Sequence, residues 1–230
     1  MKITLERFNP AVDAKPYEVE YEVPYHENIT VLEALTYIRE NYDPIAMDWS
    51  CRGRQCGRCA VMINEDSGLA CVNTLSDRSH TIRPLRGHPV IKDLVVDKTR
   101  AHESLSQTYL RQRALPLTPE EEETFNMEMQ PLLKAMEYCS RCQSCTAICP
   151  AKQANPSYVG PSQMVAIAYR HADPYDEGNR IAEAVKGGLW SCIMCGQCDS
   201  ACAALEIKHL ELWEMLRADA TAAGYPDPAL

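Results

Sequence analysis

Alternation of apolar and polar residues predicts β-strands in the first part of the chain. Residues 2–8 and 17–23 alternate, and the second stretch reads Tyr-Glu-Val-Glu-Tyr-Glu-Val with the period of two expected of a strand. Residues 60–64 form another short apolar run. Residues 81–85 close this part as a strand that we place at a sheet edge, because Pro84 cannot donate a ladder hydrogen bond.

A helical pattern separates these strands. Thr30 and Glu33 have the spacing of a capping box, in which each residue's side chain accepts a hydrogen bond from the other's backbone. The apolar residues that follow recur on one helical face: Val31, Leu32, Leu35 and Ile38. Two strands, a helix and further short strands predict a β-grasp fold.

The rest of the chain reads as helical. We expect helices over residues 93–113, 120–138, 162–170, 177–186 and 206–220. The change in pattern places a domain boundary near residue 105. The predicted fold class is therefore α+β, with a β-grasp domain over residues 1–105 and an all-α domain over residues 106–230.

Composition and charge exclude some classes of protein. The chain has 230 residues, of which 46% are hydrophobic, and no apolar stretch approaches the ~18 residues that cross a bilayer. The opening residues read as a strand and not as a signal peptide, so we expect a protein that is soluble by itself. A net charge of −9 argues against nucleic-acid binding. Four consecutive acids, Glu120–Glu123, fit a helix start capped by Thr118.

Four cysteines in the first part have the spacing of a plant-type 2Fe-2S site. The pattern C-x4-C-x2-C, followed by a distant cysteine, is typical of such sites, and its members here are Cys51, Cys56, Cys59 and Cys71. Gly53 and Gly57 suit a loop that wraps closely around an inorganic core, because glycine tolerates positive φ. The amides of such a loop can point at the cluster sulfurs.

The other eight cysteines form two runs with the same spacing, C-x2-C-x2-C-x3-C. One run is Cys139, Cys142, Cys145 and Cys149, and the other is Cys192, Cys195, Cys198 and Cys202. This spacing is typical of two-cluster bacterial ferredoxins, where the fourth cysteine of each run binds the other cluster. Zinc is the main alternative, although zinc ribbons favour two separated C-x2-C pairs. Disulfides are another, but they are rare in reducing compartments.

The order of these motifs resembles the iron–sulfur subunit of succinate dehydrogenase and fumarate reductase. The resemblance covers nearly the whole chain. It rests on the first cysteine loop, an interdomain segment, a stretch after the first run and the entry to the second run: residues 50–59, 89–97, 155–161 and 190–192.

The resemblance implies an electron-transfer subunit of a respiratory complex linked to the tricarboxylic acid cycle. In that family the subunit joins an FAD-containing flavoprotein to a membrane-anchor or quinone-binding subunit, and it has no substrate site and no catalytic residue of its own. We therefore expect a cytoplasmic location, peripheral on the inner face of the membrane through the partners. The ligand sets implied are Cys51, Cys56, Cys59 and Cys71 for 2Fe-2S, and Cys139, Cys142, Cys145 and Cys202 for the middle 4Fe-4S; Cys149, Cys192 and Cys198 hold the distal cluster.

The chain departs from the family at the second run. Most members lack the middle cysteine and keep a 3Fe-4S distal cluster, whereas this chain has Cys195. Because a cubane requires one protein ligand for each iron, we predict a distal 4Fe-4S; the alternative is 3Fe-4S with Cys195 as a spare thiol. Many quinone-reactive members have tryptophan just after the first run, where this chain has Ala151 and Lys152. Members of the family usually have proline after the last cysteine of the second run, whereas this chain has Ala203. Trp190 is expected to pack beside the distal cluster.

Two other functions compete with this interpretation. The chain can serve a different flavoprotein, or a disulfide-reducing partner as in heterodisulfide-reductase-like assemblies. It can also be a free-standing ferredoxin, although a chain of this length with three clusters favours fixed docking.

Overall fold

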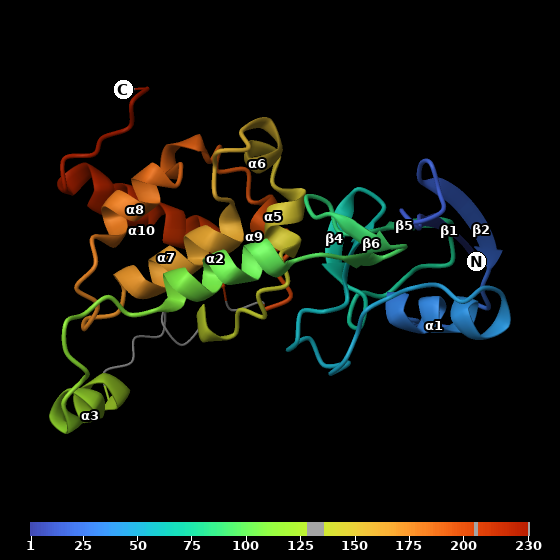
Figure 1. Ribbon diagram of the computed structural model, residues 1–230, viewed down its shortest axis with the longest axis horizontal. Helices are drawn as coiled ribbons and strands as arrows, with labels where there is room; N and C mark the ends of the chain where they lie inside the picture. The colour runs from blue at the N-terminus through green and yellow to red at the C-terminus, as the bar shows by residue number, and fades with distance from the viewer. Residues whose placement is uncertain (128–135, 205–206, 230) are drawn as a thin grey trace. The chain divides into compact units, whose positions relative to one another are not determined.

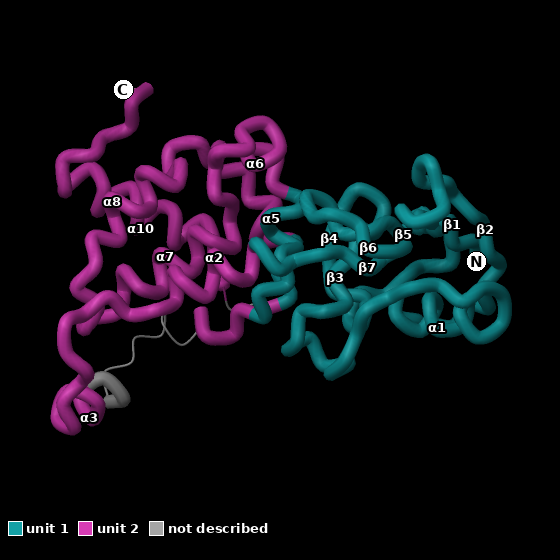
Figure 2. The backbone as a smooth tube through the Cα atoms, in the orientation of Figure 1, with its two compact units in different colours: residues 1–100, 140–148, 201–203 teal, residues 101–139, 149–200, 204–230 magenta. Residues whose placement is uncertain are grey.

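The computed structural model describes residues 1–127, 136–204 and 207–229. The chain divides into two compact units, shown in Figure 2. The first comprises Met1–Arg100 together with two short returns of the chain, Ser140–Ile148 and Ala201–Ala203. The second comprises Ala101–Cys139, Cys149–Ser200 and Ala204–Leu230.

The first unit is built on a five-stranded mixed sheet (Figure 1). Its strands, in spatial order, are β2 (Tyr17–Glu22), β1 (Lys2–Arg7), β5 (His80–Arg83), β3 (Ala60–Ile63) and β4 (Asp66–Leu69). Helix α1 (Val31–Asn41) shares a hydrophobic core with the sheet. Ile3, Leu35 and Ile82 are among its fully buried members, because strand alternation and the helical stripe both turn their apolar side inward.

The capping box predicted for α1 is confirmed. The Thr30 hydroxyl accepts a hydrogen bond from the Glu33 amide at 3.2 Å, and the Glu33 carboxylate accepts one from the Thr30 amide at 2.7 Å. This backbone hydrogen bond, assisted by the Thr30 hydroxyl, lowers the pKa of Glu33 below its ordinary value. A cap of this kind stabilises a helix by about 1 kcal/mol. Thr118 and Glu121 repeat the arrangement at the start of α3 (Pro119–Met127).

The strand predicted at an edge lies in the middle of the sheet. β5 pairs in parallel with β1 and antiparallel with β3. The prediction was wrong because Pro84 follows Arg83, the last residue of the strand, and so never has to donate a hydrogen bond inside the ladder.

The helix predicted over residues 93–113 begins only at Thr99, with α2 (Thr99–Tyr109). Residues before it form a hairpin of β6 (Val90–Lys92) and β7 (Val95–Val96). Asp93 turns this hairpin with φ of +47° and is 2% exposed. Its carboxylate accepts hydrogen bonds from the Arg7 side chain at 2.9 Å and the Ala46 amide at 2.8 Å. These distant partners override the local helical pattern.

All regular secondary structure in the described part of the second unit is helical, as predicted. After α2 and α3 come α6 (Pro150–Ala154), α7 (Pro161–His171), α8 (Arg180–Lys186), the 3₁₀ turn η1 (Leu189–Ser191), α9 (Gln197–Ser200) and α10 (His209–Ala222). The short helix α5 (Ser144–Ile148) belongs to the first unit. Residues 128–135 of the predicted helix 120–138, and residue 206 of the predicted helix 206–220, lie outside the described residues.

A buried arginine anchors α8, the helix that leads to the second cysteine run. Arg180 donates hydrogen bonds to Asp176 at 2.9 Å, to Glu183 at 2.8 Å and to the Leu110 carbonyl at 2.7 Å. Burial raises the pKa of Asp176, but the Arg180 hydrogen bonds act more strongly together with backbone amides, so that its pKa is lowered. Such a network is maintained because removing one member leaves the other charge buried and unpaired.

Across the described residues, no helix is both long and apolar enough to cross a membrane.

Candidate metal centres

The first cysteine loop lies in the first unit and has an unusual backbone. Arg52 and Arg54 have φ of +55° and Gly57 has φ of +66°. A non-glycine residue in this region costs about 1–3 kcal/mol and persists only where its surroundings enforce it. The result is a loop whose amides turn inward: the Cys51 sulfur accepts hydrogen bonds from the amides of Gly53 and Cys56, both at 3.3 Å.

These amides favour a thiolate. The Gly53 hydrogen bond, followed by that of Cys56, lowers the pKa of Cys51 to about 7. Cys59, at the entrance to β3, is only 5% exposed, and burial raises the pKa of its thiol to about 12. A buried thiol ionises when a metal ion binds it, because the metal supplies the compensating charge. The donor set of this loop therefore fits an iron–sulfur group.

The two later runs share one backbone conformation. Arg141 and Gln143 have φ of +55° and +74° in the first run, and Met194 and Gly196 have φ of +54° and +76° at the equivalent positions of the second. The Cys192 sulfur also accepts a hydrogen bond from the Met194 amide at 3.4 Å. Consecutive amides that alternate in this way form a concavity that binds anionic groups. The repeated spacing thus corresponds to a repeated local structure.

The last cysteine of each run falls in a different compact unit from the cysteine directly before it in that run, and Cys139, like Cys149, belongs to the second unit. Cys142 and Cys145 lie in the first unit, where Cys202 joins them within the short return Ala201–Ala203 (Figure 2). Cys149 is the first residue of the next stretch of the second unit, which also holds the remaining cysteines of the second run: Cys192, Cys195 and Cys198. Cys139 directly precedes the stretch that enters the first unit.

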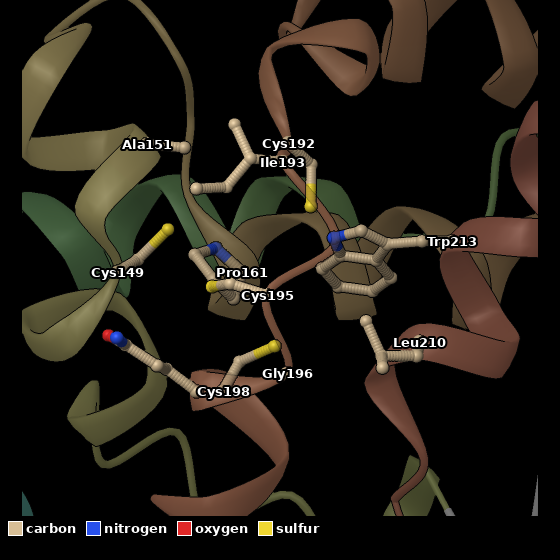
Figure 3. A pocket seen from close by; sticks show the side chains of 11 residues that line it. Cys149, Ala151, Pro161, Cys192, Ile193, Cys195, Gly196, Cys198, Leu210 and Trp213 are labelled. Atoms are coloured by element: carbon tan, nitrogen blue, oxygen red, sulfur yellow. The ribbon is translucent and has the colours of Figure 1, made fainter.

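Four cysteines of the second unit line one pocket, seen in Figure 3: Cys149, Cys192, Cys195 and Cys198. Apolar side chains, including Pro161, Leu210 and Trp213, complete its wall. Cys198 is buried, which raises the pKa of its thiol to about 12, and burial also raises that of Cys149. Cys195, in contrast, is exposed. The structure thus brings Cys195 together with the three cysteines that the family pattern assigns to the distal site.

The tryptophan of this pocket is not the one expected from the sequence. Trp190 lines a separate hollow with Tyr225 and Pro226, and the guanidinium of Arg217 lies 5.3 Å from its ring centre. Trp213 lines the cysteine pocket instead, delivered by the buried face of α10. A helical pattern through Leu212, Trp213 and Leu216 could have placed Trp213 in the core, but nothing local indicates which cysteines it faces.

Within the first unit, the first cysteine loop comes very close to the first run. A Cβ atom built on Gly57 would lie 2.5 Å from the Ser140 carbonyl oxygen and 3.0 Å from the Cα of Cys142. Lys98 donates a hydrogen bond from its Nζ to the Gly57 carbonyl at 3.1 Å. Burial lowers the pKa of Lys98, while the nearby thiols, Cys142 first, act in the opposite direction. Sequence reasoning identified Gly57 only as a loop residue and missed Lys98.

Of the described residues, no three His, Cys, Asp or Glu side chains lie close enough to bind one metal ion together. An iron–sulfur cluster makes a different demand, because each of its irons is bound by only one cysteine in 4Fe-4S or two in 2Fe-2S.

Two family models match this chain, one over the first four cysteines and the other over the two later runs. Residues 2–103 match the model of a 2Fe-2S iron–sulfur cluster binding domain, and residues 135–205 match that of a 4Fe-4S dicluster domain. The chain is 23% identical to a chain of the Mycobacterium smegmatis Sdh1 complex in the apo form, with a TM-score of 0.83 over 100% of this chain and 98% of that one. At this identity the likeness establishes the fold.

Relatives in sequence include subunits of fumarate reductases. One, from Methanothermobacter marburgensis, is named as a subunit of fumarate reductase (CoM/CoB); it is 35% identical over 88% of this chain, which covers 40% of that protein. The chain thus spans less than half the length of the longer archaeal relatives that it matches. The fumarate reductase iron–sulfur subunit of Haemophilus influenzae is 32% identical over 88% of this chain and 86% of the relative. The chain therefore belongs to the family of fumarate reductase and succinate dehydrogenase iron–sulfur subunits.

Proposed function

We propose that this chain is the electron-transfer subunit of a succinate dehydrogenase or fumarate reductase complex. It passes single electrons between the FAD of a flavoprotein subunit and a quinone or membrane partner. The observation that carries the proposal is the placement of the twelve cysteines: four around the first loop, and two runs whose last cysteines, Cys149 and Cys202, are exchanged between the units.

We propose the following ligand sets, which this placement supports for every cysteine except Cys139; Cys139 directly precedes the stretch of the first unit that holds Cys142 and Cys145. Cys51, Cys56, Cys59 and Cys71 hold a 2Fe-2S cluster; Cys139, Cys142, Cys145 and Cys202 hold a 4Fe-4S cluster; Cys149, Cys192, Cys195 and Cys198 hold a second 4Fe-4S cluster. When bound, these groups supply one-electron redox sites. The chain's own residues contribute thiolates and inward-pointing amides, and the burial of Cys59, Cys149 and Cys198 limits water at part of each of their sites.

The chemistry on succinate or fumarate belongs to the flavoprotein partner in this proposal, and this chain has no catalytic residue. The exposed Cys51 loop suits an approach by the flavoprotein, since electrons must enter near the surface of the subunit. The exposed Cys195 and Ile193, the latter 65% exposed, suit docking of the second partner. We place the assembled complex at the inner face of the membrane, on the cytoplasmic side, held there by its partners.

The proposed function is tested by purifying the native complex without oxygen and adding succinate. We expect an FAD-containing subunit to copurify, and succinate to reduce the clusters as seen by electron paramagnetic resonance (EPR). Fumarate should then reoxidise the prereduced clusters. If all clusters are intact and the EPR spectrum of the complex changes with neither succinate nor fumarate, the proposal is contradicted.

A second candidate is an electron wire for a thiol–disulfide partner. The 35% identical relative from M. marburgensis is named a fumarate reductase (CoM/CoB), and coenzymes M and B are thiols. In this version, electrons enter from a thiol pair that is oxidised to a disulfide, rather than passing to a quinone. The reductant distinguishes the two: a CoM and CoB thiol mixture that reduces the clusters favours this candidate, and a quinol that does so favours the first.

Substituting one cysteine at a time by serine tests the crossed ligation. Cys202→Ser should damage the cluster of Cys139, Cys142 and Cys145, while Cys149→Ser should damage that of Cys192, Cys195 and Cys198, because each removes a ligand from the remote site. EPR spectra of the two variants serve as controls for each other. Damage confined to the cluster of the mutated run would contradict the exchange.

Cys195 decides the type of the distal cluster. With a thiolate for every iron, we expect about ten irons per chain and no 3Fe-4S signal in the oxidised protein. Cys195→Ala should lose about one iron and acquire that signal. A full-occupancy 3Fe-4S signal in the unaltered, anaerobically isolated protein would show that Cys195 is not a ligand.

The close approach at Gly57 predicts a strong effect of a single methyl group. A side chain at the positive φ of Gly57 costs about 1–3 kcal/mol of backbone strain. Gly57→Ala should lower the free energy of unfolding by more than this strain alone, because the added Cβ also clashes with the Ser140 carbonyl. It should also weaken the magnetic interaction between the first and middle clusters. Gly87→Ala is the matched control: φ there is +86°, but a Cβ meets nothing within 4 Å. Equal destabilisation of the two variants, measured by denaturant unfolding, would contradict the prediction.

A further inference from the structure

Among the described residues of the second unit, several buried side-chain donors lack a hydrogen-bond partner, and two of them, a tyrosine hydroxyl and an indole, lie close to each other. Tyr158 and Trp213 are both 0% exposed. Neither the Tyr158 hydroxyl nor the Trp213 Nε1 has a hydrogen-bond partner of acceptable geometry among the residues that the structure describes. Buried polar groups are nearly always satisfied, so each orphan requires an explanation.

Trp213 lies beside the distal cysteines, and Tyr158 lies close to Trp213. Trp213 lines the pocket of Cys149, Cys192, Cys195 and Cys198, and in Figure 3 the nitrogen edge of its ring faces the side of the pocket where the Cys192 sulfur lies. Burial raises the pKa of Tyr158, the charges of Cys192, Cys149 and Cys198 raise it further, and a contact from the Trp213 indole, which falls short of hydrogen-bond geometry, lowers it. The hydroxyl therefore lies close to the indole and within electrostatic reach of the same sulfur set.

The backbone around Tyr158 holds it in place. The Tyr158 carbonyl accepts a hydrogen bond from Lys152 at 2.6 Å, and the next amide, of Val159, donates to Gly187 at 2.9 Å. Gly188, with φ of +91°, passes so close that a Cβ would lie 3.2 Å from the Tyr158 ring. The ring is thus confined between this segment and the entry to the second run.

Trp213 is fixed through α10. His209, one turn earlier, meets its ring edge-on with the centroids 5.7 Å apart. The Asp199 carboxylate accepts a hydrogen bond from the His209 amide at 2.6 Å and lies 3.0 Å from the His209 Nδ1. Because Asp199 follows Cys198 directly, the same contact holds the tryptophan and the second run together.

A sulfur-rich anion is the acceptor that this arrangement lacks. Thiolates and inorganic sulfides accept hydrogen bonds, and donors that face them stabilise the negative charge. The charge increases by one when an electron arrives, so the reduced state gains more than the oxidised state. Neither donor has to lose its proton for this effect.

We propose that Tyr158 and Trp213 are positioning residues of the distal cluster, donating hydrogen bonds to its sulfurs and raising its reduction potential. The inference rests on the proposed function in one respect, that the four pocket cysteines bind a cluster. It adds a physical role for the two donors: they offset the extra negative charge that a Cys195 thiolate brings to this site.

The test is an EPR-monitored redox titration of the anaerobically purified complex. Tyr158→Phe removes only the hydroxyl, and we expect it to lower the equilibrium constant for reducing the distal cluster three- to tenfold; tenfold corresponds to about 59 mV for one electron. Trp213→Phe should shift it in the same direction. Tyr169→Phe is the hydroxyl control, because that hydroxyl already bonds to Glu137 at 3.3 Å. Trp190→Phe is the indole control, because its unpartnered Nε1 lines a different hollow.

A second measurement uses the unaltered protein and does not depend on folding of the variants. After exchange into heavy water, pulsed EPR of the distal cluster should detect a coupled deuteron, which Tyr158→Phe then weakens. No coupled deuteron, or an unchanged equilibrium constant in Tyr158→Phe with its cluster intact, would overturn the proposal. A complex in which both effects appear but succinate reduces nothing would refute the proposed function while leaving this inference standing.

Discussion

A backbone contact too close for any side chain organises the first unit. Gly57, in the first cysteine loop, lies against the carbonyl of Ser140 and the Cα of Cys142, so that two cysteine loops far apart in the chain are adjacent. Lys98 reinforces the contact from the other side through the Gly57 carbonyl. The Ser67 hydroxyl, which donates to the Ser144 carbonyl at 2.8 Å, binds the same return of the chain to the sheet. Electron transfer requires such proximity, and the absence of one methyl group permits it.

The proposed clusters would also contribute to the stability of the folded chain. Residues such as Arg141 and Met194 hold positive φ, at a cost of about 1–3 kcal/mol each. Metal–thiolate bonds in the proposed clusters would offset this cost, because the free energy of binding to a site absent from the unfolded chain also contributes to folding. The exchange of Cys149 and Cys202 between the units would make each unit depend on a cluster anchored in both runs. With clusters bound, the thiolates would add negative charge to a chain whose net charge is already −9, and the inward amides and Lys98 would offset part of it.

Much of this protein is readable from local sequence. Cysteine spacing depends on the geometry of one short loop at a time, so C-x4-C-x2-C and the two C-x2-C-x2-C-x3-C runs predicted the kinds of site that the family models confirm. The same is true of the capping box at Thr30, where both partners lie within four residues, and of the strands and helices with clear periods. The α+β class followed from these elements, because each depends on neighbours in the chain.

Tertiary structure decided what depends on distant partners. β5 became a central strand because β1 and β3 flank it, and Asp93 formed a turn instead of a helix start because Arg7 and Ala46 supply its hydrogen bonds. The tryptophan that faces the distal cysteines is Trp213 and not Trp190, since the packing of α10 chooses between them. Residue spacing along the chain does not predict these contacts, because each one forms between two segments that come together only in the folded chain.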